Sequence, residues 1–267
     1  MAAPQITSTK NPLIKSLRAL VVRDIQEPDD RLVVEGVRMI EEALASGVAV
    51  EVILYDPTAM TGLRAVAVLD RARKQGVRLV TATTRVVAAC SQVETAQGII
   101  AVVVHPRAVL SDVLASPHLI VVIADRIQDP GNLGAIIRIA DAAGASGVAS
   151  TTGSVDARNP KAVRATMGSL FHLPVASAPA PELVAALRER HVRILLADPA
   201  GTSDYTQVDY RSPIAIVLGN EGEGPDALWR TVSPTTVRIP LYGQADSLNV
   251  AVAAALLLYE ARRLREG

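Results

Sequence analysis

Short runs of β-branched residues alternate with helical stretches along the first hundred residues. Such alternation is typical of a layered α/β domain. The pattern predicts strands at 31–35, 50–54, 77–80 and 99–104, and helices at 36–46, 62–75 and 84–90. Because the last strand runs into His105-Pro106, we expect a linker near residues 105–115 and a first domain covering residues 1–106.

The second half, residues 107–267, has its own pattern and begins with the nearly pure apolar strand 119–124. A strand without polar alternation is expected to be buried on both faces of a parallel sheet. Further strands are predicted at 147–150, 173–176, 193–197, 214–218 and 236–239, and helices at 133–143, 161–167, 181–190, 225–232 and 248–264. Ligands of such sheets bind beyond the carboxyl ends of the strands, which directs attention to the loops after Ala124, Leu218 and Ile239.

Composition narrows the class of protein. With 49% hydrophobic and 20% charged residues, the 267-residue chain is expected to be compact rather than disordered. The longest apolar run, 250–259, is too short to cross a bilayer, and the first residues lack the pattern of a secretion signal. Cys90 is the only cysteine and the four histidines are scattered, so we expect neither a disulfide nor a metal site, and a cytoplasmic location.

Basic residues near the start are the best candidates for contacts with nucleic acid. The net charge is zero, so any affinity for a polyanion must come from local patches. Lys10, Lys15, Arg18 and Arg23 recur in a segment with no acid before Asp24. A solvated amphipathic helix explains this pattern equally well.

A second candidate for phosphate contact is Arg164, in the segment 154–164, although a solvated helix start also explains that segment. Aromatic residues make up only 3% of the chain, which argues against a platform that stacks bases.

The loop after Ala124 leads into a helix that carries Arg138. Gly131 and Gly134 allow a close approach of backbone or ligand, and Asn132 is expected to cap the helix. Arg138 then lies just over one turn inside, as a surface side chain or as part of a site. The Gly-x-x-Gly spacing differs from the dinucleotide-binding pattern, and the chain contains no nucleoside triphosphate loop.

The two later loops also contain residues suited to a ligand site. Residues 218–225 combine three glycines with two carboxylates, which is poor core and poor helix, and Glu221 is the acid expected to pair with an arginine. In the loop after Ile239, Ser247 is expected to cap the last helix. Asn249 is expected to be a buried amide that needs partners.

Three motifs in these loops resemble those of the SpoU, or TrmH, branch of the SPOUT superfamily of RNA methyltransferases. They are Asn132-x-Gly134-x3-Arg138, Leu218-Gly219-Asn220-Glu221-Gly222 and Ile239-Pro240-x6-Ser247-Leu248-Asn249-Val250. The resemblance covers about residues 118–264. The N-terminal part resembles the family's substrate-binding domain of the ribosomal protein L30e type, and 95–101 is similar to a segment that ends that domain.

The resemblance implies a parallel sheet tied as a deep trefoil knot with helices on both faces, and a homodimer with its site near the subunit interface. It also implies S-adenosyl-L-methionine as cofactor. The cofactor-binding residues it implies are Leu218, Gly219, Asn220, Gly222, Ile239, Leu241, Ser247 and Leu248. Leu241 and Asp246 stand where methionine and glutamate are common in relatives, which removes no working group.

The implied activity is methyl transfer to a ribose 2′-hydroxyl, most similar to the members that modify 23S ribosomal RNA. Arginine stays protonated in proteins, so Arg138 is expected to stabilise the developing alkoxide rather than act unaided as a base. Glu221 and Asn249 would orient Arg138, Asn132 would position the ribose or its phosphate, and Ser247 would complete the set. The alternatives are a transfer RNA ribose methyltransferase and a catalytically silent RNA-binding relative.

Overall fold

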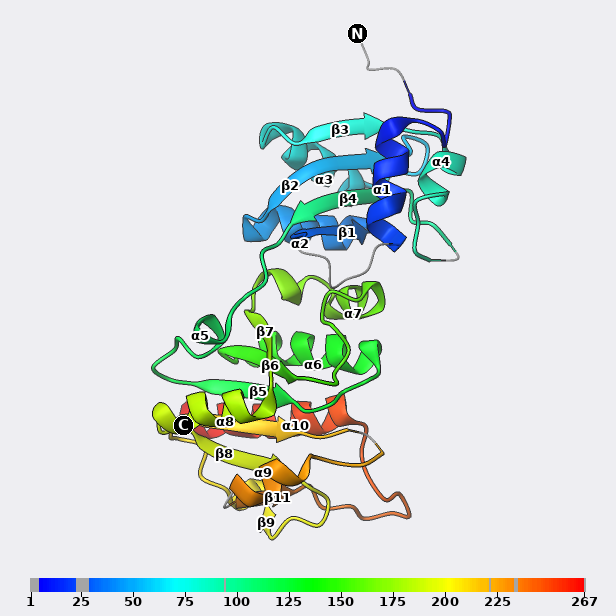
Figure 1. Cartoon of the computed structure of the whole chain (residues 1–267). Helices are drawn as coiled ribbons and strands as arrows, with labels where there is room; N and C mark the ends of the chain where they lie inside the picture. The colour runs from blue at the N-terminus through cyan, green and yellow to red at the C-terminus, as the bar shows by residue number, and fades with distance from the viewer. Residues whose placement is uncertain (1–4, 23–28, 94, 221, 233–234, 267) are drawn as a thin grey trace. The chain divides into compact units, whose positions relative to one another are not determined.

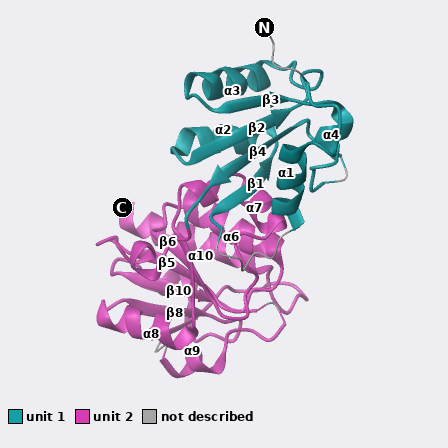
Figure 2. Cartoon of the chain, turned by 45° about the horizontal axis from the view of Figure 1, so that its top comes forward, with its two compact units in different colours: residues 1–106 teal, residues 107–267 magenta. Residues whose placement is uncertain are grey.

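The chain forms two compact units, Met1–Pro106 and Arg107–Gly267, in this computed structural model (Figure 2). The structure describes residues 5–22, 29–93, 95–220, 222–232 and 235–266. Glu221 and Arg23, two residues singled out from the sequence, lie outside the described residues. Among the described residues, no helix has the length and apolar character needed to span a membrane.

Unit 1 is a four-stranded sheet with helices on both sides (Figure 1). Its strands lie in the order β1-β4-β2-β3, with β4 antiparallel to both neighbours and β2 parallel to β3. The elements are α1 (Pro12–Val22), β1 (Arg31–Glu35), α2 (Val37–Ser46), β2 (Ala49–Tyr55), α3 (Leu63–Lys74), β3 (Arg78–Thr81), α4 (Thr84–Ala88) and β4 (Ile99–Val104).

Helices α1 and α4 cover one face of this sheet. Ile14 and Leu17 of α1 are buried with Val86 and Val87 of α4 against alternate residues of β2 and β4. Since Ile14 and Leu17 are three residues apart, they leave the opposite side of α1 to polar residues. The amphipathic helix considered for this basic segment is therefore formed.

Unit 2 is a seven-stranded sheet in the order β7-β6-β5-β10-β8-β11-β9, and every recorded pairing is parallel. The elements up to β8 are α5 (Leu110–Val113), β5 (Ile120–Ala124), α6 (Pro130–Ala142), β6 (Gly147–Thr151), α7 (Pro160–Thr166), η1 (Ser169–Phe171), β7 (Val175–Ala178), α8 (Ala180–Glu189) and β8 (Arg193–Ala197). The rest are β9 (Ser203–Asp204), η2 (Tyr205–Gln207), β10 (Ile214–Leu218), α9 (Ala227–Val232), β11 (Thr235–Arg238) and α10 (Val250–Glu266).

The central strands β5 and β10 are buried at every position, as their uninterrupted apolar sequences predict. Helices α6 and α10 pack on one face of the sheet, and α5, α8 and α9 pack on the other. The predicted α/β class, with a parallel sheet between two helical layers, is confirmed. The sheet order brings the carboxyl ends of β8, β10 and β11 side by side, although they are separated in sequence.

Two predicted helix caps are wrong. Helix α6 begins at Pro130, three residues earlier than predicted, and its cap is Asp129, whose side chain accepts a hydrogen bond from the Asn132 backbone N–H. Asp-Pro is itself a strong helix start, because the carboxylate caps and the proline ring already has a helical φ. Helix α10 is capped by Asn249 rather than Ser247, since Asn249 Oδ1 accepts from the backbone N–H groups of Ala251 and Val252.

Arg265 connects the end of α10 to the rest of unit 2 through hydrogen bonds. Its guanidinium donates to the carbonyl of Tyr210 at 2.7 Å, of His118 at 2.9 Å and of Leu119 at 3.1 Å, and also to that of Ser212. Partial burial lowers the pKa of Arg265 from its usual value. One side chain therefore joins the last helix to the segments before β5 and β10.

We expect Arg265→Ala to lower the free energy of unfolding by about 2 kcal/mol, because it removes four hydrogen bonds at once and leaves the Tyr210 carbonyl, at a partly buried position, without a recorded donor. Arg263 is the matched control: it lies two residues away, and its only recorded partner among the described residues is the carboxylate of Glu260 on the same helix. Arg263→Ala should change the free energy of unfolding by no more than about 0.5 kcal/mol. Equal losses of unfolding free energy for the two variants in urea denaturation would contradict this role of Arg265.

Candidate active site

Two asparagines meet where the N-terminal ends of α6 and α10 come together. Asn249 Nδ2 donates to Asn132 Oδ1 at 3.0 Å, although the two residues are 117 positions apart. Because Asn249 Oδ1 accepts from the N–H groups at the start of α10, its amide group is fixed in orientation. The expectation that Asn249 is buried is wrong: it is exposed, and its partners come from capping and from Asn132.

The carboxylate of Asp129 lies beside this asparagine pair and forms an ion pair with Lys161. Asp129 Oδ1 accepts from the Asn132 backbone N–H at 2.8 Å, and Asp129 Oδ2 accepts from Lys161 Nζ at 3.2 Å. These bonds, with the one from Asn132 as the larger cause, hold the pKa of Asp129 below its ordinary value. The carboxylate is thus kept ionised, as both its capping role and its ion pair require.

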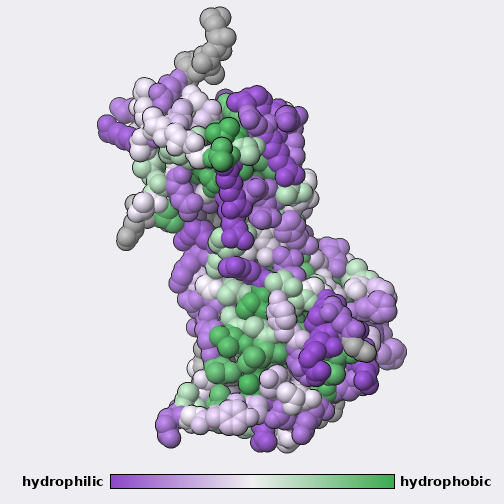
Figure 3. Space-filling model, turned by 180° about the vertical axis from the view of Figure 1, so that it is seen from behind, coloured by the Kyte–Doolittle hydropathy of each residue, from purple (hydrophilic) through white to green (hydrophobic). Residues whose placement is uncertain are grey.

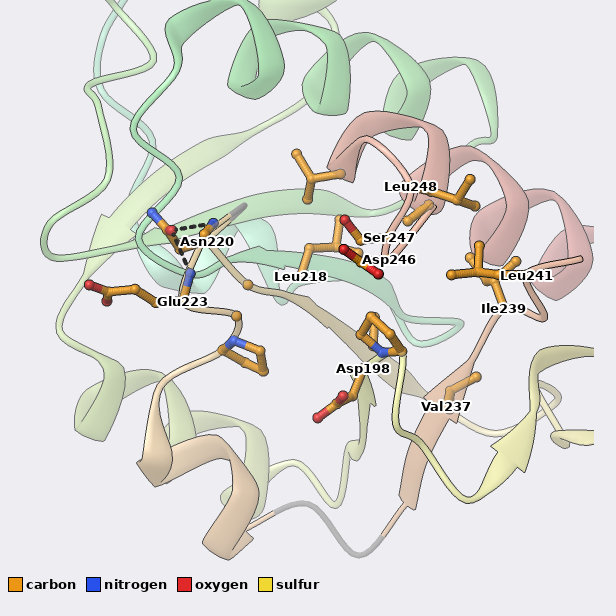
Figure 4. Close-up of a pocket in the computed structure, with 18 residues that line it drawn as sticks. Asp198, Leu218, Asn220, Glu223, Val237, Ile239, Leu241, Asp246, Ser247 and Leu248 are labelled. Atoms are coloured by element: carbon orange, nitrogen blue, oxygen red, sulfur yellow. Dashed lines mark hydrogen bonds between the residues drawn. The ribbon is translucent and has the colours of Figure 1, made fainter. Parts of the chain in front are cut away.

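A pocket of about 530 Å³ opens at the carboxyl ends of β8, β10 and β11 (Figure 4). Its apolar walls come from strand ends and from α10, and its polar groups from the connecting loops. The lining residues are Ala197, Asp198, Pro199, Leu218, Gly219, Asn220, Gly222, Glu223, Gly224, Pro225, Val237, Ile239, Leu241, Asp246, Ser247, Leu248, Val250 and Ala253. The set includes every residue assigned to cofactor binding from the sequence.

The contribution of β8 to this pocket was missed. Ala197 ends β8, Asp198 and Pro199 follow it, and all three line the pocket, yet this segment has no motif that marks it in the sequence. The loop after β8 could have been found from its position alone, because every parallel strand of such a sheet ends on the same edge.

Gly219 is required by the close packing of the loop after β10. A Cβ built on this residue would lie 2.1 Å from the Pro225 nitrogen and 2.5 Å from the Gly224 carbonyl carbon. Asn220 shapes the same loop, since its Oδ1 accepts from the backbone N–H groups of Gly222 at 2.8 Å and Glu223 at 3.1 Å. The pocket wall is therefore a tight backbone turn.

Arg126 joins this turn to the loop after β5. It donates to Glu223 Oε2 at 2.9 Å and to the Gly224 carbonyl at 3.1 Å, while Asn220 Nδ2 donates to the Arg126 carbonyl at 3.0 Å. Its φ of 54° is unusual for a residue with a side chain. Sequence reasoning missed Arg126, because the contacts that favour this φ come from residues nearly a hundred positions away.

The other predicted catalytic residues occupy different places. Ser247 lines the pocket from an exposed loop. Arg138 is exposed on the outer side of α6 and has no recorded hydrogen bond or ion pair with another described residue. Its expected pairing with Glu221 involves a residue outside the described part of the chain.

None of the described residues proposed to contact RNA is among those that line the pocket. Lys10, Lys15 and Arg18 are exposed on and just before α1 in unit 1. Arg164 is half-buried in the last turn of α7 in unit 2.

Comparison with known proteins gives matches over both units. Residues 119–259 match the SpoU rRNA Methylase family, and residues 11–101 match the MRM3-like substrate binding domain. The chain is 34% identical over 259 residues to the 23S rRNA (guanosine(2553)-2′-O)-methyltransferase RlmP of Bacillus subtilis, covering 97% of this chain and 99% of the relative.

Two further matches extend over nearly the whole chain. A 23S rRNA (uridine(2479)-2′-O)-methyltransferase of Streptomyces viridochromogenes is 35% identical, covering 99% of this chain and 93% of the relative. A crystal structure of an AdoMet-bound rRNA methyltransferase from Sinorhizobium meliloti superimposes with a TM-score of 0.85 at 31% identity, covering 97% of each chain. Motifs, fold and relatives agree, and the chain belongs to the SpoU rRNA methylase family.

Proposed function

We propose that this protein transfers the methyl group of S-adenosyl-L-methionine to a ribose 2′-hydroxyl of large-subunit ribosomal RNA. The observation that carries the proposal is the convergence of two loops, 218–225 and 239–249, on one pocket beside the Asn132–Asn249 pair. The relatives of similar length are 23S rRNA 2′-O-methyltransferases by name. A transfer RNA substrate is the alternative that the experiment below distinguishes.

The pocket fits an adenosyl cofactor in shape and chemistry. Leu218, Ile239 and Leu248 offer apolar surfaces for a base, and the loop backbone between them offers polar groups for a ribose. The absence of a Cβ at Gly219 keeps the turn compact. When bound, the cofactor supplies a methyl group already activated by a sulfonium, so the protein's tasks are alignment and charge stabilisation.

Arg138 would stabilise the negative charge that develops on the attacking 2′-oxygen. A guanidinium stays protonated near neutral pH, which suits this role better than proton removal. Asn132 would position the ribose or its phosphate.

Asn249 would act on the substrate through Asn132. Its oxygen accepts two backbone N–H groups and its nitrogen donates to Asn132, so its described contacts orient Asn132 rather than Arg138. This assignment replaces the direct contact with Arg138 that the sequence suggested.

A homodimer would bring Arg138 to a pocket. Val252 and Tyr259 of α10 are 49% and 55% exposed, and the partly buried Ala135 and Ile139 of α6 lie on the same helical layer. Figure 3, drawn from the side on which α10 lies, shows hydrophobic residues gathered on unit 2. A second copy of this chain would cover this surface and bring Arg138, which is exposed next to Ile139 on α6, near the partner's site.

Unit 1 would hold the RNA through the basic face of α1, which presents Lys15 and Arg18 next to Lys10. The match to a substrate-binding domain supports this role, and we propose a cytoplasmic location, where ribosomal RNA is available. Helices α1 and α4 contain no acidic residue that would weaken the attraction to phosphates.

Replacing Lys10, Lys15 and Arg18 together with glutamine should weaken RNA binding about tenfold or more and reduce its dependence on salt concentration. The control replaces three exposed basic residues at the end of α3, Arg71, Arg73 and Lys74, with glutamine. Both variants lose the same formal charge. Equal weakening in filter-binding titrations at several salt concentrations would show that α1 has no special role.

The proposed activity is tested by incubating the protein with S-adenosyl-L-methionine labelled in its methyl group and with separate large-subunit rRNA, small-subunit rRNA and transfer RNA, all from cells lacking the protein. Digestion to nucleosides and mass spectrometry then identify the product. We expect a single 2′-O-methylnucleoside from large-subunit rRNA. Label on a base, or transfer confined to transfer RNA or small-subunit rRNA, would refute the assignment.

A further inference from the structure

Charge around the pocket is distributed unevenly. The described lining residues include three carboxylates, those of Asp198, Glu223 and Asp246, and no lysine, arginine or histidine. Two of the three carboxylates form ion pairs with described arginines: Glu223 pairs with Arg126, and Asp198 pairs with Arg230. Asp246 has no recorded ion pair with any residue that the structure describes, so among the described lining carboxylates it is the one whose charge has no recorded counter-ion.

Asp246 lies in the wall of the pocket. It immediately precedes Ser247 and Leu248, and all three line the pocket. Figure 4 shows its carboxylate beside Ser247 and among the labelled pocket residues. The residue is exposed, so its carboxylate oxygens are accessible as hydrogen-bond acceptors for a ligand in the pocket.

We propose that Asp246 makes the pocket selective for the cationic cofactor over its neutral product, an inference that rests on the proposed function. S-adenosyl-L-methionine carries a sulfonium, an ammonium and a carboxylate, which gives a net charge of plus one. Loss of the methyl group converts the sulfonium to a neutral thioether, so S-adenosylhomocysteine has no net charge. A carboxylate within a few ångströms attracts the first ligand as a whole and the second only through its ammonium.

The consequence is release of the product after each turnover. The adenosyl contacts are shared by both ligands and cannot distinguish them, whereas the charge disappears in the reaction itself. At a solvated site the attraction between two charges about 4 Å apart is weak, equivalent to a factor of about five in binding. That factor is sufficient to set which ligand occupies the pocket when both are present at similar concentrations.

The test uses isothermal titration of the full-length protein with S-adenosyl-L-methionine, S-adenosylhomocysteine and sinefungin, an analogue with an amine in place of the sulfonium. We expect Asp246→Asn to weaken binding of both cationic ligands by a factor of about five and to change S-adenosylhomocysteine binding less than twofold. Asp246→Glu, which keeps the charge, should retain the selectivity. Glu182→Gln, an equal change of charge on exposed α8, should leave all three affinities unchanged.

An equal loss of affinity for the three ligands in Asp246→Asn, or no loss for any, would overturn the inference while leaving the proposed function intact. If the parent protein binds none of the three ligands, the proposed function is refuted, and the inference with it. A second readout is salt: the preference for the cationic ligands should decline as ionic strength rises, because the carboxylate is exposed.

Discussion

Replacing Arg138 with alanine should lower the rate of methyl transfer at saturating substrates about 10²- to 10³-fold, the usual effect of removing one group that stabilises a developing oxyanion. Affinity for S-adenosyl-L-methionine should stay within about twofold, because Arg138 is not among the residues that line the pocket. Arg138→Lys should recover part of the rate, since it keeps the charge but loses the planar set of donors. Single-turnover kinetics and cofactor titration measure the two effects separately.

The matched control is Arg188→Ala, which removes an exposed arginine from α8, on the other helical layer of unit 2. It should leave the rate unchanged. A similar rate for Arg138→Ala and Arg188→Ala would show that Arg138 takes no part in the reaction.

Gly219→Ala should abolish detectable cofactor binding. The added Cβ would lie 2.1 Å from the Pro225 nitrogen and 2.6 Å from its Cα, and both are backbone atoms that cannot rotate away. The turn must open to accept the methyl group, which displaces the wall that Leu218 and Asn220 help to form. Titration with S-adenosyl-L-methionine checks this loss, and circular dichroism establishes that the variant is folded.

The control for this variant lies in the same turn. A Cβ on Gly222 would meet nothing nearer than Asn220 Oδ1 at 3.5 Å, an ordinary contact. Gly222→Ala should therefore bind the cofactor within about threefold of the parent. Comparable losses in the two variants would mean that the turn tolerates no side chain at any position and that the specific clash at Gly219 is irrelevant.

If the chain forms the proposed homodimer, Arg138→Ala and Gly219→Ala together reveal which subunit supplies Arg138. In a mixed dimer of Arg138→Ala and Gly219→Ala subunits, the Arg138→Ala subunit keeps an intact pocket and its partner keeps Arg138. If the guanidinium serves the partner's site, mixing the inactive variants should restore up to about half of the parent activity per mixed dimer. No recovery would indicate that Arg138 acts within its own subunit.

The sequence predicted most elements because their burial patterns are simple. Strands such as Ile214–Leu218 and Ile99–Val104 are apolar runs bounded by polar or turn residues, and their predicted limits match the structure. Strand β9, with only two residues, contains no hydrophobic pattern to detect, and it owes its place to pairing with β11. The trefoil knot implied by the family resemblance stays a prediction.

The cap errors have a common cause. Asn132 and Ser247 are residues that favour caps, yet Asp129 and Asn249 satisfy the backbone N–H groups instead. Propensity ranks the candidates at a helix start but does not choose between neighbours a few residues apart. The choice depends on where the helix docks, which is a tertiary property.

The site was predictable in its motif residues and not in its supports. Gly219, Ile239 and Leu248 carry recognisable patterns, and the structure brings them to one pocket. Arg126 and Asp198 have no such pattern: one depends on contacts with a loop nearly a hundred residues away, and the other is paired with Arg230 of α9. Long-range partners of this kind become visible only once the sheet order is known.

A crystal structure of the protein grown with saturating S-adenosyl-L-methionine tests the central claim most directly. Our account predicts the adenosyl group against Gly219, Ile239 and Leu248, with the methyl-bearing end directed toward the Asn132–Asn249 pair and an Arg138 guanidinium. Cofactor bound elsewhere on the molecule, or an empty pocket between these loops at saturation, would contradict it.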